Sequence, residues 1–139
     1  MNVIVDTSVW SLGLRRTDRQ LNPHQRVVVV ELKEIINEGR VRLLGFIRQE
    51  ILSGIKSPAQ FEKLRTSLRS FPDITLEVSD YEAAAESSNV CRSKGVTVSV
   101  VDALIATVAR ARGWSVFTDD ADFEHIARIV PMTLHSVRH

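Results

Sequence analysis

The sequence predicts an α/β fold, an α/β/α sandwich in which helices flank a central parallel sheet. Short apolar runs rich in Val and Ile alternate with longer segments whose apolar residues recur at helical spacing, an order typical of parallel sheets. The first run, Asn2–Asp6, has three consecutive β-branched residues, as expected of a central strand buried on both faces. Because no linker, repeat or low-complexity tract interrupts the chain, we expect one domain over residues 1–139.

The first half of the chain continues with one strand and three helices. Apolar residues at helical spacing predict a helix over His24–Glu38, which a glycine ends. Val41–Leu44 is predicted as a second short strand. Two further helices are expected at Phe46–Lys56 and Pro58–Arg69, because both keep the helical period and the Ser-Pro step between them breaks it.

The second half begins with a predicted strand at Ile74–Val78. Ser79 followed by Glu82 has the spacing of a capping box and predicts a helix that runs to about Lys94. Ser99 is expected to cap the next helix. The remaining predicted elements are a largely buried helix at Val100–Arg112, a strand at Ser115–Thr118, a helix at Asp122–Arg128 and a strand at Met132–His135.

The composition fits a domain with its own core. At 139 residues and 44% hydrophobic content, the chain can bury a sizeable core without disulfides. No apolar run approaches the roughly 20 residues of a membrane span, and Asp6 falls where the apolar region of a signal peptide would lie. Cys91 is the only cysteine, which excludes a disulfide framework and a thiolate metal site. We therefore expect a cytoplasmic protein that does not bind membranes.

The charge distribution favours a polyanionic partner. The net charge is +1, but without the five candidate site acids named below, 18 basic residues face 12 acidic ones. Fourteen of the 18 are arginines, which can bind phosphate through two parallel hydrogen bonds. An acidic site in a basic surface suits a polyanion held around metal ions, although an ordinary solvated exterior could have the same composition.

Four acidic segments lie at the ends of predicted strands or near the starts of helices. Asp6 ends the first strand, and the run 119–122 follows the fourth. Asp102 lies in the first turn of its helix, and Glu50 lies one turn into its own. Since the crevices of parallel sheets lie beyond the carboxyl ends of the strands, we expect these acids to meet. Such a cleft needs protons or divalent cations, and hard cations such as Mg²⁺ or Mn²⁺ prefer oxygen ligands.

Each acid by itself also has a purely structural explanation. Asp6 could cap a turn or a helix, and Asp102 stands at the Glu/Gln position of a capping box that Ser99 opens. Glu50 could be a solvated helix residue, and acids at 119–122 are favoured by the helix dipole. Their coincidence at matching topological positions favours a shared site. Neither a Gly-rich phosphate loop nor a histidine cluster offers an alternative.

The acids stand in four motifs, Val3-Ile4-Val5-Asp6-Thr7-Ser8-Val9-Trp10, Gln49-Glu50-Ile51-Leu52, Asp102-Ala103-Leu104-Ile105-Ala106 and Thr118-Asp119-Asp120-Ala121-Asp122-Phe123. In order and spacing these motifs resemble the four signatures of the PIN-domain nucleases and, more narrowly, of the VapC toxins of prokaryotic toxin–antitoxin pairs. The resemblance covers the whole chain. Each motif alone is weak, whereas the ordered set is highly specific.

The resemblance assigns roles to individual residues. Ser8 and Thr118 match small hydroxyl residues that help to orient the acids. Asp120 and Asp122 match the fourth acidic position of the family, and Asp119 fills a variable position beside them. The first three acids of the family pattern fall on Asp6, Glu50 and Asp102.

The resemblance further implies a PIN-like fold and a Mg²⁺- or Mn²⁺-dependent endoribonuclease. Asp6 and Asp102 would be the main ligands of one ion, with Asp120 or Asp122 completing the site or holding a second ion. Glu50 would position or deprotonate a water that attacks the RNA directly, leaving 5′-phosphate and 3′-hydroxyl ends. Two interpretations compete with this one: a structure-specific DNA nuclease and a non-catalytic RNA-binding module.

A cognate VapB-type antitoxin that holds the toxin inactive is also implied. Three predicted helices have enough apolar residues to form a groove for an antitoxin segment. They are the first helix, His24–Glu38, and the helices Phe46–Lys56 and Pro58–Arg69. A basic residue of that segment would enter the acidic pocket. The competing interpretation is that these apolar residues only pack against the sheet.

Similar toxins are usually homodimers, and two helices offer small residues that would allow close approach across a two-fold axis. The competing interpretation is that these faces pack within one subunit. The residues concerned are Tyr81, Ala84, Ala85 and Val90 on the helix that starts at Ser79, and Ala103, Ala106, Thr107 and Arg110 on the next.

Overall fold

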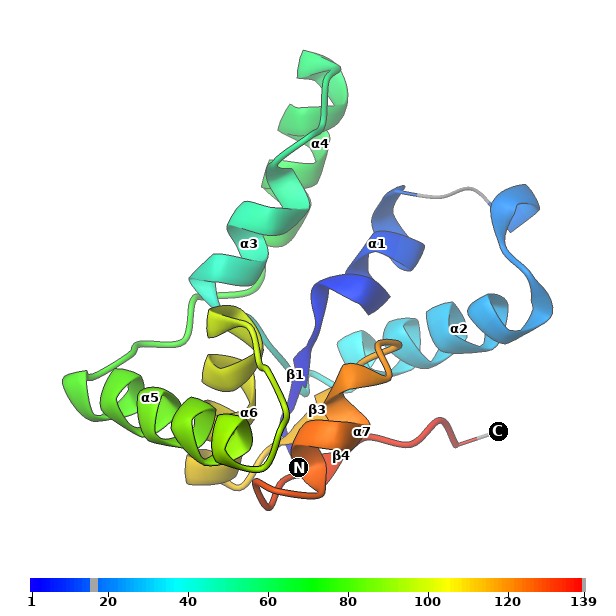
Figure 1. Ribbon diagram of the computed structural model, residues 1–139. Coiled ribbons are helices and arrows are strands. Elements are labelled where there is room, and N and C mark those ends of the chain that lie inside the picture. Colours follow the sequence, from blue (N-terminus) through cyan, green and yellow to red (C-terminus); the bar gives the residue numbers. More distant parts are fainter. Residues whose placement is uncertain (16–17, 139) are drawn as a thin grey trace.

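A four-stranded parallel sheet forms the centre of the molecule (Figure 1). The structure, a computed structural model, describes residues 1–15 and 18–138. The strands are β1 (Val3–Val5), β2 (Val41–Arg42), β3 (Ser115–Phe117) and β4 (Thr133–Leu134). They lie in the order β2-β1-β3-β4, and every neighbouring pair is parallel. The predicted α/β fold with a parallel sheet is confirmed.

Helices flank this sheet on both faces. They are α1 (Thr7–Arg15), α2 (Pro23–Asn37), α3 (Gly45–Leu52), α4 (Pro58–Leu68), α5 (Val78–Ser93), α6 (Val100–Arg112) and α7 (Asp122–Ala127), with a 3₁₀ turn at Asp18–Gln20. The chain crosses from β1 to β2 in one direction, through α1 and α2, and returns to β3 in the other, through α3 to α6. Right-handed crossovers therefore place α1 and α2 on one face and α6 and α7 on the opposite face.

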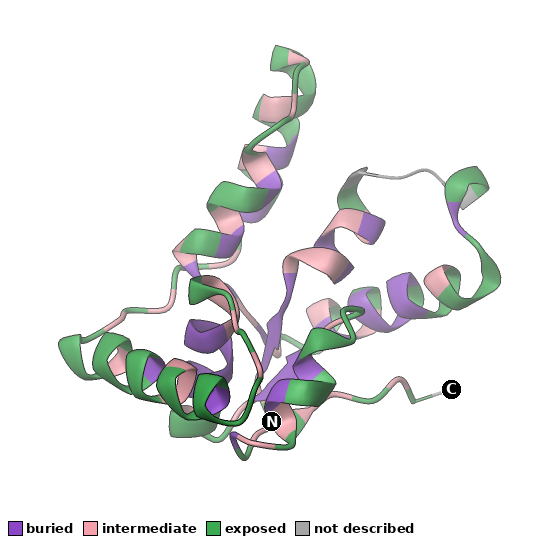
Figure 2. Cartoon of the chain, in the orientation of Figure 1, coloured by how far each residue is buried: buried purple, intermediate pink, exposed green. Residues whose placement is uncertain are grey.

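The core is built around β1 and α6. Val3, Ile4 and Val5 are fully buried, as predicted for a central strand covered on both faces. In α6 every residue of the stretch 103–109 is at most 7% exposed, so this helix is buried around most of its circumference (Figure 2). Ser99 caps it as predicted, because its hydroxyl accepts a hydrogen bond from the backbone of Asp102 at 3.1 Å.

The small residues of α6 pack within the subunit. Ala103, Ala106 and Thr107 are buried where α6 contacts α5 and β3, and Ala84 of α5 is buried in the same core. They allow two helices of one chain to approach closely, so they are not available to a dimer face. Tyr81 stays 51% exposed on α5.

The strand predicted at Ile74–Val78 is wrong. The amide of Ile74 donates to the carbonyl of Leu43 at 2.8 Å, and Leu43 forms an isolated parallel bridge with Asp73. The chain then leaves the edge of the sheet and turns into α5. Ile74 and Leu76 are half-buried between exposed neighbours, and this period of two explains why the segment resembles a strand.

The start of α5 also differs from the prediction. Its N-cap is Glu77, whose amide donates to the carboxylate of Asp80 at 2.8 Å, so the capping box predicted for Ser79 and Glu82 is wrong. Asp80 is held in this position by Arg112, which donates to both of its carboxylate oxygens at 3.1 Å. A contact between α5 and α6 therefore decides where α5 begins.

Two further helices, α1 and α3, differ from the prediction. Helix α1 was not predicted, although Val9 and Leu12 recur at helical spacing and are buried. The helix predicted at Phe46–Lys56 ends at Leu52, because Gly54 adopts a positive φ of 85° and turns the chain. Within the part of the chain that the structure describes, no helix is long and apolar enough to cross a membrane.

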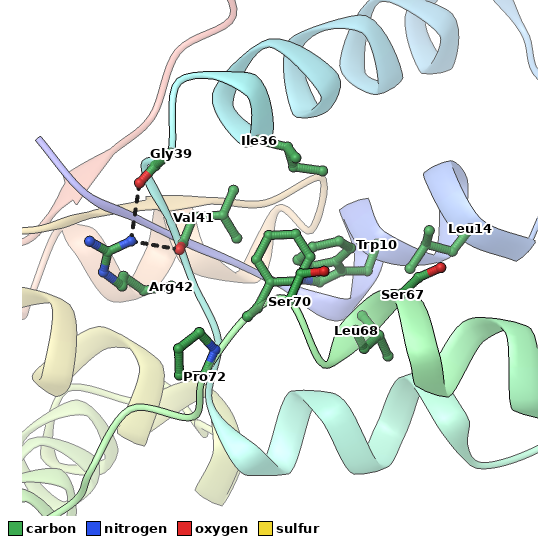
Figure 3. Close-up of a pocket in the computed structure, with 11 residues that line it drawn as sticks. Trp10, Leu14, Ile36, Gly39, Val41, Arg42, Ser67, Leu68, Ser70 and Pro72 are labelled. Atoms are coloured by element: carbon green, nitrogen blue, oxygen red, sulfur yellow. Dashed lines mark hydrogen bonds between the residues drawn. The ribbon is translucent and has the colours of Figure 1, made fainter.

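A cavity of about 580 Å³ lies between α1, the end of α2 and α4 (Figure 3). Apolar side chains such as Trp10, Leu14, Ile36 and Phe71 form most of its wall. Arg42 also lines it and donates to the backbone carbonyl groups of Gly39 and Val41 at 3.2 and 2.9 Å. Leu14 also lines a second cavity of about 290 Å³ between α1 and α4.

Candidate metal centre

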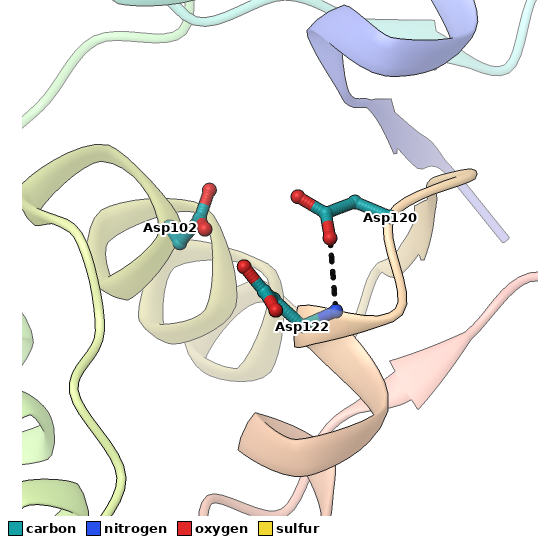
Figure 4. A group of neighbouring side chains, drawn as sticks. All are labelled: Asp102, Asp120 and Asp122. Carbon is teal, nitrogen blue, oxygen red and sulfur yellow. Dashed lines mark hydrogen bonds between the residues drawn. The ribbon is translucent and has the colours of Figure 1, made fainter.

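Three carboxylates from two separate segments of the chain meet at one end of the sheet (Figure 4). Asp102 lies in the first turn of α6, Asp120 lies in the loop after β3, and Asp122 is the first residue of α7. One oxygen from each of the three lies within 4.8 Å of the others. These are three of the acids that the sequence predicted to converge.

Asp6 stands beside this group at the end of β1. Its amide continues the sheet ladder by donating to the carbonyl of Phe117 at 2.9 Å, and the residue is only 7% exposed. One carboxylate oxygen, Oδ2, accepts hydrogen bonds from Ser8 Oγ at 2.7 Å and Thr118 Oγ1 at 2.9 Å. The two hydroxyl residues predicted to support the site therefore fix one oxygen of Asp6 and leave the other available.

The loop after β3 is held by side chain to backbone hydrogen bonds. Thr118 Oγ1 accepts from the amide of Asp120 at 3.0 Å, and Asp120 Oδ1 accepts from the amide of Asp122 at 2.9 Å. Ser8 Oγ accepts from the amide of Asp119 at 3.0 Å. Ser8 and Thr118 thus connect Asp6 to the loop that carries the other acids.

The carboxylates of the group repel one another, and this repulsion affects the pKa of Asp102. Burial, followed by the negative charge of Asp6 and more weakly of Asp120 and Asp122, raises the pKa of Asp102 to about 6. The donor atoms are all carboxylate oxygens, which Mg²⁺ and Mn²⁺ prefer. A divalent cation fits this set, since it would neutralise charges that otherwise repel one another.

Glu50 does not join the three clustered acids. It is exposed on α3, and the group found among residues 1–15 and 18–138 consists of Asp102, Asp120 and Asp122. The role expected for Glu50 therefore stays a prediction.

A contact between His24 and Asp119, which was not predicted, lies beside the acidic group. His24 Nε2 lies 2.8 Å from Asp119 Oδ1 and joins the start of α2 to the loop after β3. The histidine side chain is 69% exposed, so we expect the pair to add little stability. No local pattern indicates this contact, because 95 residues separate its partners.

The PIN-domain family matches residues 3–129, and this chain belongs to that family. Ribonuclease VapC11 of Mycobacterium tuberculosis (strain ATCC 25618 / H37Rv) is 31% identical over 140 residues, which cover 98% of this chain and 99% of the relative. The alignment with this VapC ribonuclease therefore covers almost the whole of both chains.

Solved structures share the fold at lower identity. VapBC2 from Rickettsia felis, bound to a DNA fragment from their promoter, matches with a TM-score of 0.74 and 18% identity over 97% of this chain and 98% of that chain. A toxin–antitoxin complex from Klebsiella pneumoniae matches with a TM-score of 0.61 and 18% identity over 88% and 90%.

Proposed function

We propose that this protein is a divalent-metal-dependent endoribonuclease and the toxin of a type II toxin–antitoxin module. The observation that carries the proposal is the convergence of Asp102, Asp120 and Asp122 beside Asp6. A binding module for RNA would gain nothing from four acids next to a phosphate backbone. The relative named as a VapC ribonuclease supports RNA as the substrate class.

All four acids are metal ligands in this proposal. Asp102, Asp120 and Asp122 would hold the cation, with Asp6 as a further ligand through the oxygen that Ser8 and Thr118 leave free. A bound Mg²⁺ or Mn²⁺ supplies a Lewis acid that stabilises negative charge on the scissile phosphate. The hydroxyl groups around Asp6 keep its carboxylate in one orientation, so little reorganisation is needed when RNA binds.

Water is the attacking group in this proposal, and the products carry 5′-phosphate and 3′-hydroxyl ends. Glu50 would position or deprotonate this water from the exposed side of α3 when RNA lies across the site.

Cleavage of RNA by the purified, antitoxin-free chain tests the proposal. We expect activity with Mg²⁺ or Mn²⁺, none in EDTA, and a loss of at least about a hundredfold in Asp6→Asn and Asp102→Asn. Glu86→Gln, which changes an exposed acid of α5 outside the group, is the matched control and should cleave normally. Equal activity in EDTA, or full activity of both Asn variants, would contradict the proposal. Single-stranded and flap DNA, added as parallel substrates, would identify a DNA nuclease.

A VapB-type antitoxin is the proposed protein partner. The two cavities beside α1 and α4 form an apolar groove with Leu14 shared between them, which suits an amphipathic peptide segment. Residues of α1, α4 and the end of α2 line this groove, whereas no residue of α3, which was also expected to contribute, lines either cavity. A basic residue of the same segment would reach the acids and compete with the cation, so inhibition needs no change of fold.

A homodimer is proposed with α5 as the contact, since Tyr81 and Val90 on this helix are 51% and 45% exposed. Light scattering at micromolar concentration should give about twice the chain mass of 15.6 kDa. A fully active monomer would remove the dimer from the proposal. A cytoplasmic location follows from the proposed action on cellular RNA.

A further inference from the structure

A third cavity, of about 310 Å³, opens directly beside the acidic group. Asp102 and Asp122 form one part of its wall, so a molecule bound there lies against the candidate metal centre. The segment 95–99, which connects α5 to α6, and one side of α7 form the rest. The proposed chemistry uses only the two acids of this wall.

Three apolar side chains, Val96, Val98 and Ile126, form part of the remaining wall. Val96 and Val98 are half-buried and pack against the core, and Ile126 of α7 is 2% exposed. Thr97 contributes a hydroxyl group at the exposed edge. The wall thus combines these apolar side chains with polar ones, and 310 Å³ is at the lower end of the range for small-ligand sites.

His125 gives this cavity an aromatic surface. It lies on α7 three residues after Asp122, so the two side chains share one face of the helix. Its exposed imidazole lines the cavity. Unpaired RNA bases stack on the faces of His and other aromatic side chains and hydrogen-bond through their edges.

We infer that this cavity is a nucleotide subsite that takes one unpaired base of the RNA next to the scissile phosphate. The base stacks on His125 between the valine side chains, Thr97 meets its edge, and the phosphate of the same nucleotide faces the cation. The orientation follows from charge, because Asp102 and Asp122 would repel a phosphate that no cation neutralises. The inference rests on the proposed ribonuclease function and adds a place where a base is read.

Binding of nucleoside 5′-monophosphates tests the inference without any cleavage, since these molecules contain no internal phosphodiester. AMP, GMP, CMP and UMP would be titrated into the full chain with Mg²⁺, with ribose 5-phosphate as the probe that lacks a base. Amide shifts in ¹H–¹⁵N spectra report the location. We expect at least one nucleotide to shift Thr97, Val98 and His125 and to bind at least tenfold more tightly than ribose 5-phosphate.

Two variants separate stacking from hydrogen bonding. His125→Ala should remove most of the difference between nucleotide and ribose 5-phosphate, a loss of about tenfold in affinity. His125→Phe should keep most of it, because a phenyl ring offers a stacking face without ring nitrogens. Glu124→Gln changes the neighbouring exposed residue of α7, outside the cavity wall, and should leave nucleotide affinity unchanged.

The binding experiments can succeed or fail independently of RNA cleavage. No nucleotide binding, equal binding of ribose 5-phosphate, or shifts confined to the groove around Trp10 and Phe71 would overturn the subsite, even if the chain cleaves RNA. Nucleotide binding at Thr97 and His125 that is lost in His125→Ala would support the subsite, even if no RNA is cleaved. In an active enzyme, His125→Ala should in addition change which base adjoins the cut.

Discussion

At the scale of single residues, Asp102 is an acid that the fold holds at a cost. Burial and the charge of Asp6 raise its pKa to about 6, so its charged form is disfavoured in the folded protein. A carboxyl group whose pKa is raised by folding destabilises the folded protein fully at pH values above the folded pKa. At pH values below the unfolded pKa it has no such effect. Such residues are frequent at functional sites, where a ligand neutralises them.

Replacing Asp102 by Asn should therefore stabilise the metal-free protein while it abolishes activity. At pH 8 in EDTA we expect a gain of about 1 kcal/mol, or about 4 °C in Tm, after allowing for the partial exposure of the group. The gain should shrink as the pH falls below 6 and vanish well below 3.8, the ordinary pKa of the group, where wild-type Asp102 is protonated in both states. Calorimetry across this pH range measures it, and an unchanged or lower Tm at pH 8 would contradict it.

Thr118 acts on the site through hydrogen bonds only. Its hydroxyl donates to Asp6 and accepts from the amide of Asp120, so one side chain orients two of the acids. Thr118→Val should weaken Mg²⁺ binding by about tenfold to a hundredfold, since residues that orient ligands have effects of this size. A Mg²⁺ titration of cleavage rate or binding heat measures this. Thr133→Val, at an exposed position of β4, is the control, and an identical Mg²⁺ dependence in both variants would rule the role out.

At the scale of elements, a buried ionic cluster fixes α2 to the end of the chain. Glu31 of α2 is fully buried and accepts hydrogen bonds from Arg138 Nε at 3.2 and 3.1 Å. His135 Nε2 lies 2.6 Å from the same carboxylate, and its ring packs edge-on against Phe117. Phe117 directly precedes Thr118, so this cluster supports the strand end that positions the acids.

Glu31→Gln should lower the free energy of unfolding by about 2 kcal/mol at pH 7, because hydrogen bonds to a charged group are lost. Burial raises the pKa of Glu31, but hydrogen bonds from His135 and Arg138 outweigh it and hold this pKa below its ordinary value. The wild-type advantage is therefore complete above pH 4.5 and is lost as the pH falls through the lower folded value. Urea unfolding measures it against Glu34→Gln, whose carboxylate is 41% exposed. Equal losses in the two variants would contradict a special role for Glu31.

At the scale of the whole molecule, catalysis and antitoxin binding should be separable. Leu14 lines both cavities of the groove and is 38% exposed, whereas the acids lie elsewhere. Leu14→Glu should reduce antitoxin binding by at least about tenfold, since a charge in an apolar groove is poorly solvated. RNA cleavage should be unchanged.

Two measurements check that Leu14→Glu affects antitoxin binding alone. They are copurification with an antitoxin encoded by the neighbouring gene and an RNA cleavage assay. Val30→Glu, at a 50% exposed position of α2 outside both cavities, provides the matched control. Normal copurification of Leu14→Glu would place the antitoxin on another surface.

The sequence by itself determined the features that depend on neighbours along the chain. The uninterrupted β-branched run of β1, the cap at Ser99 and the bounds of α6 are local, and all three are as predicted. The meeting of Asp102, Asp120 and Asp122 was also predictable, because parallel strands and the helices that follow them end at the same rim.

Only the tertiary structure decided which faces of the helices and strands are buried and which elements bury them. Glu31 looks like a solvated helix residue in the sequence, yet it is buried because His135, 104 residues away, lies against it. Ile74 and its neighbours have the period of a strand, but the sheet edge offers them a single bridge. The alanines of α6 could serve either a dimer or the core, and α5 occupies them. In each case the local pattern is compatible with two partners, and long-range packing chooses between them.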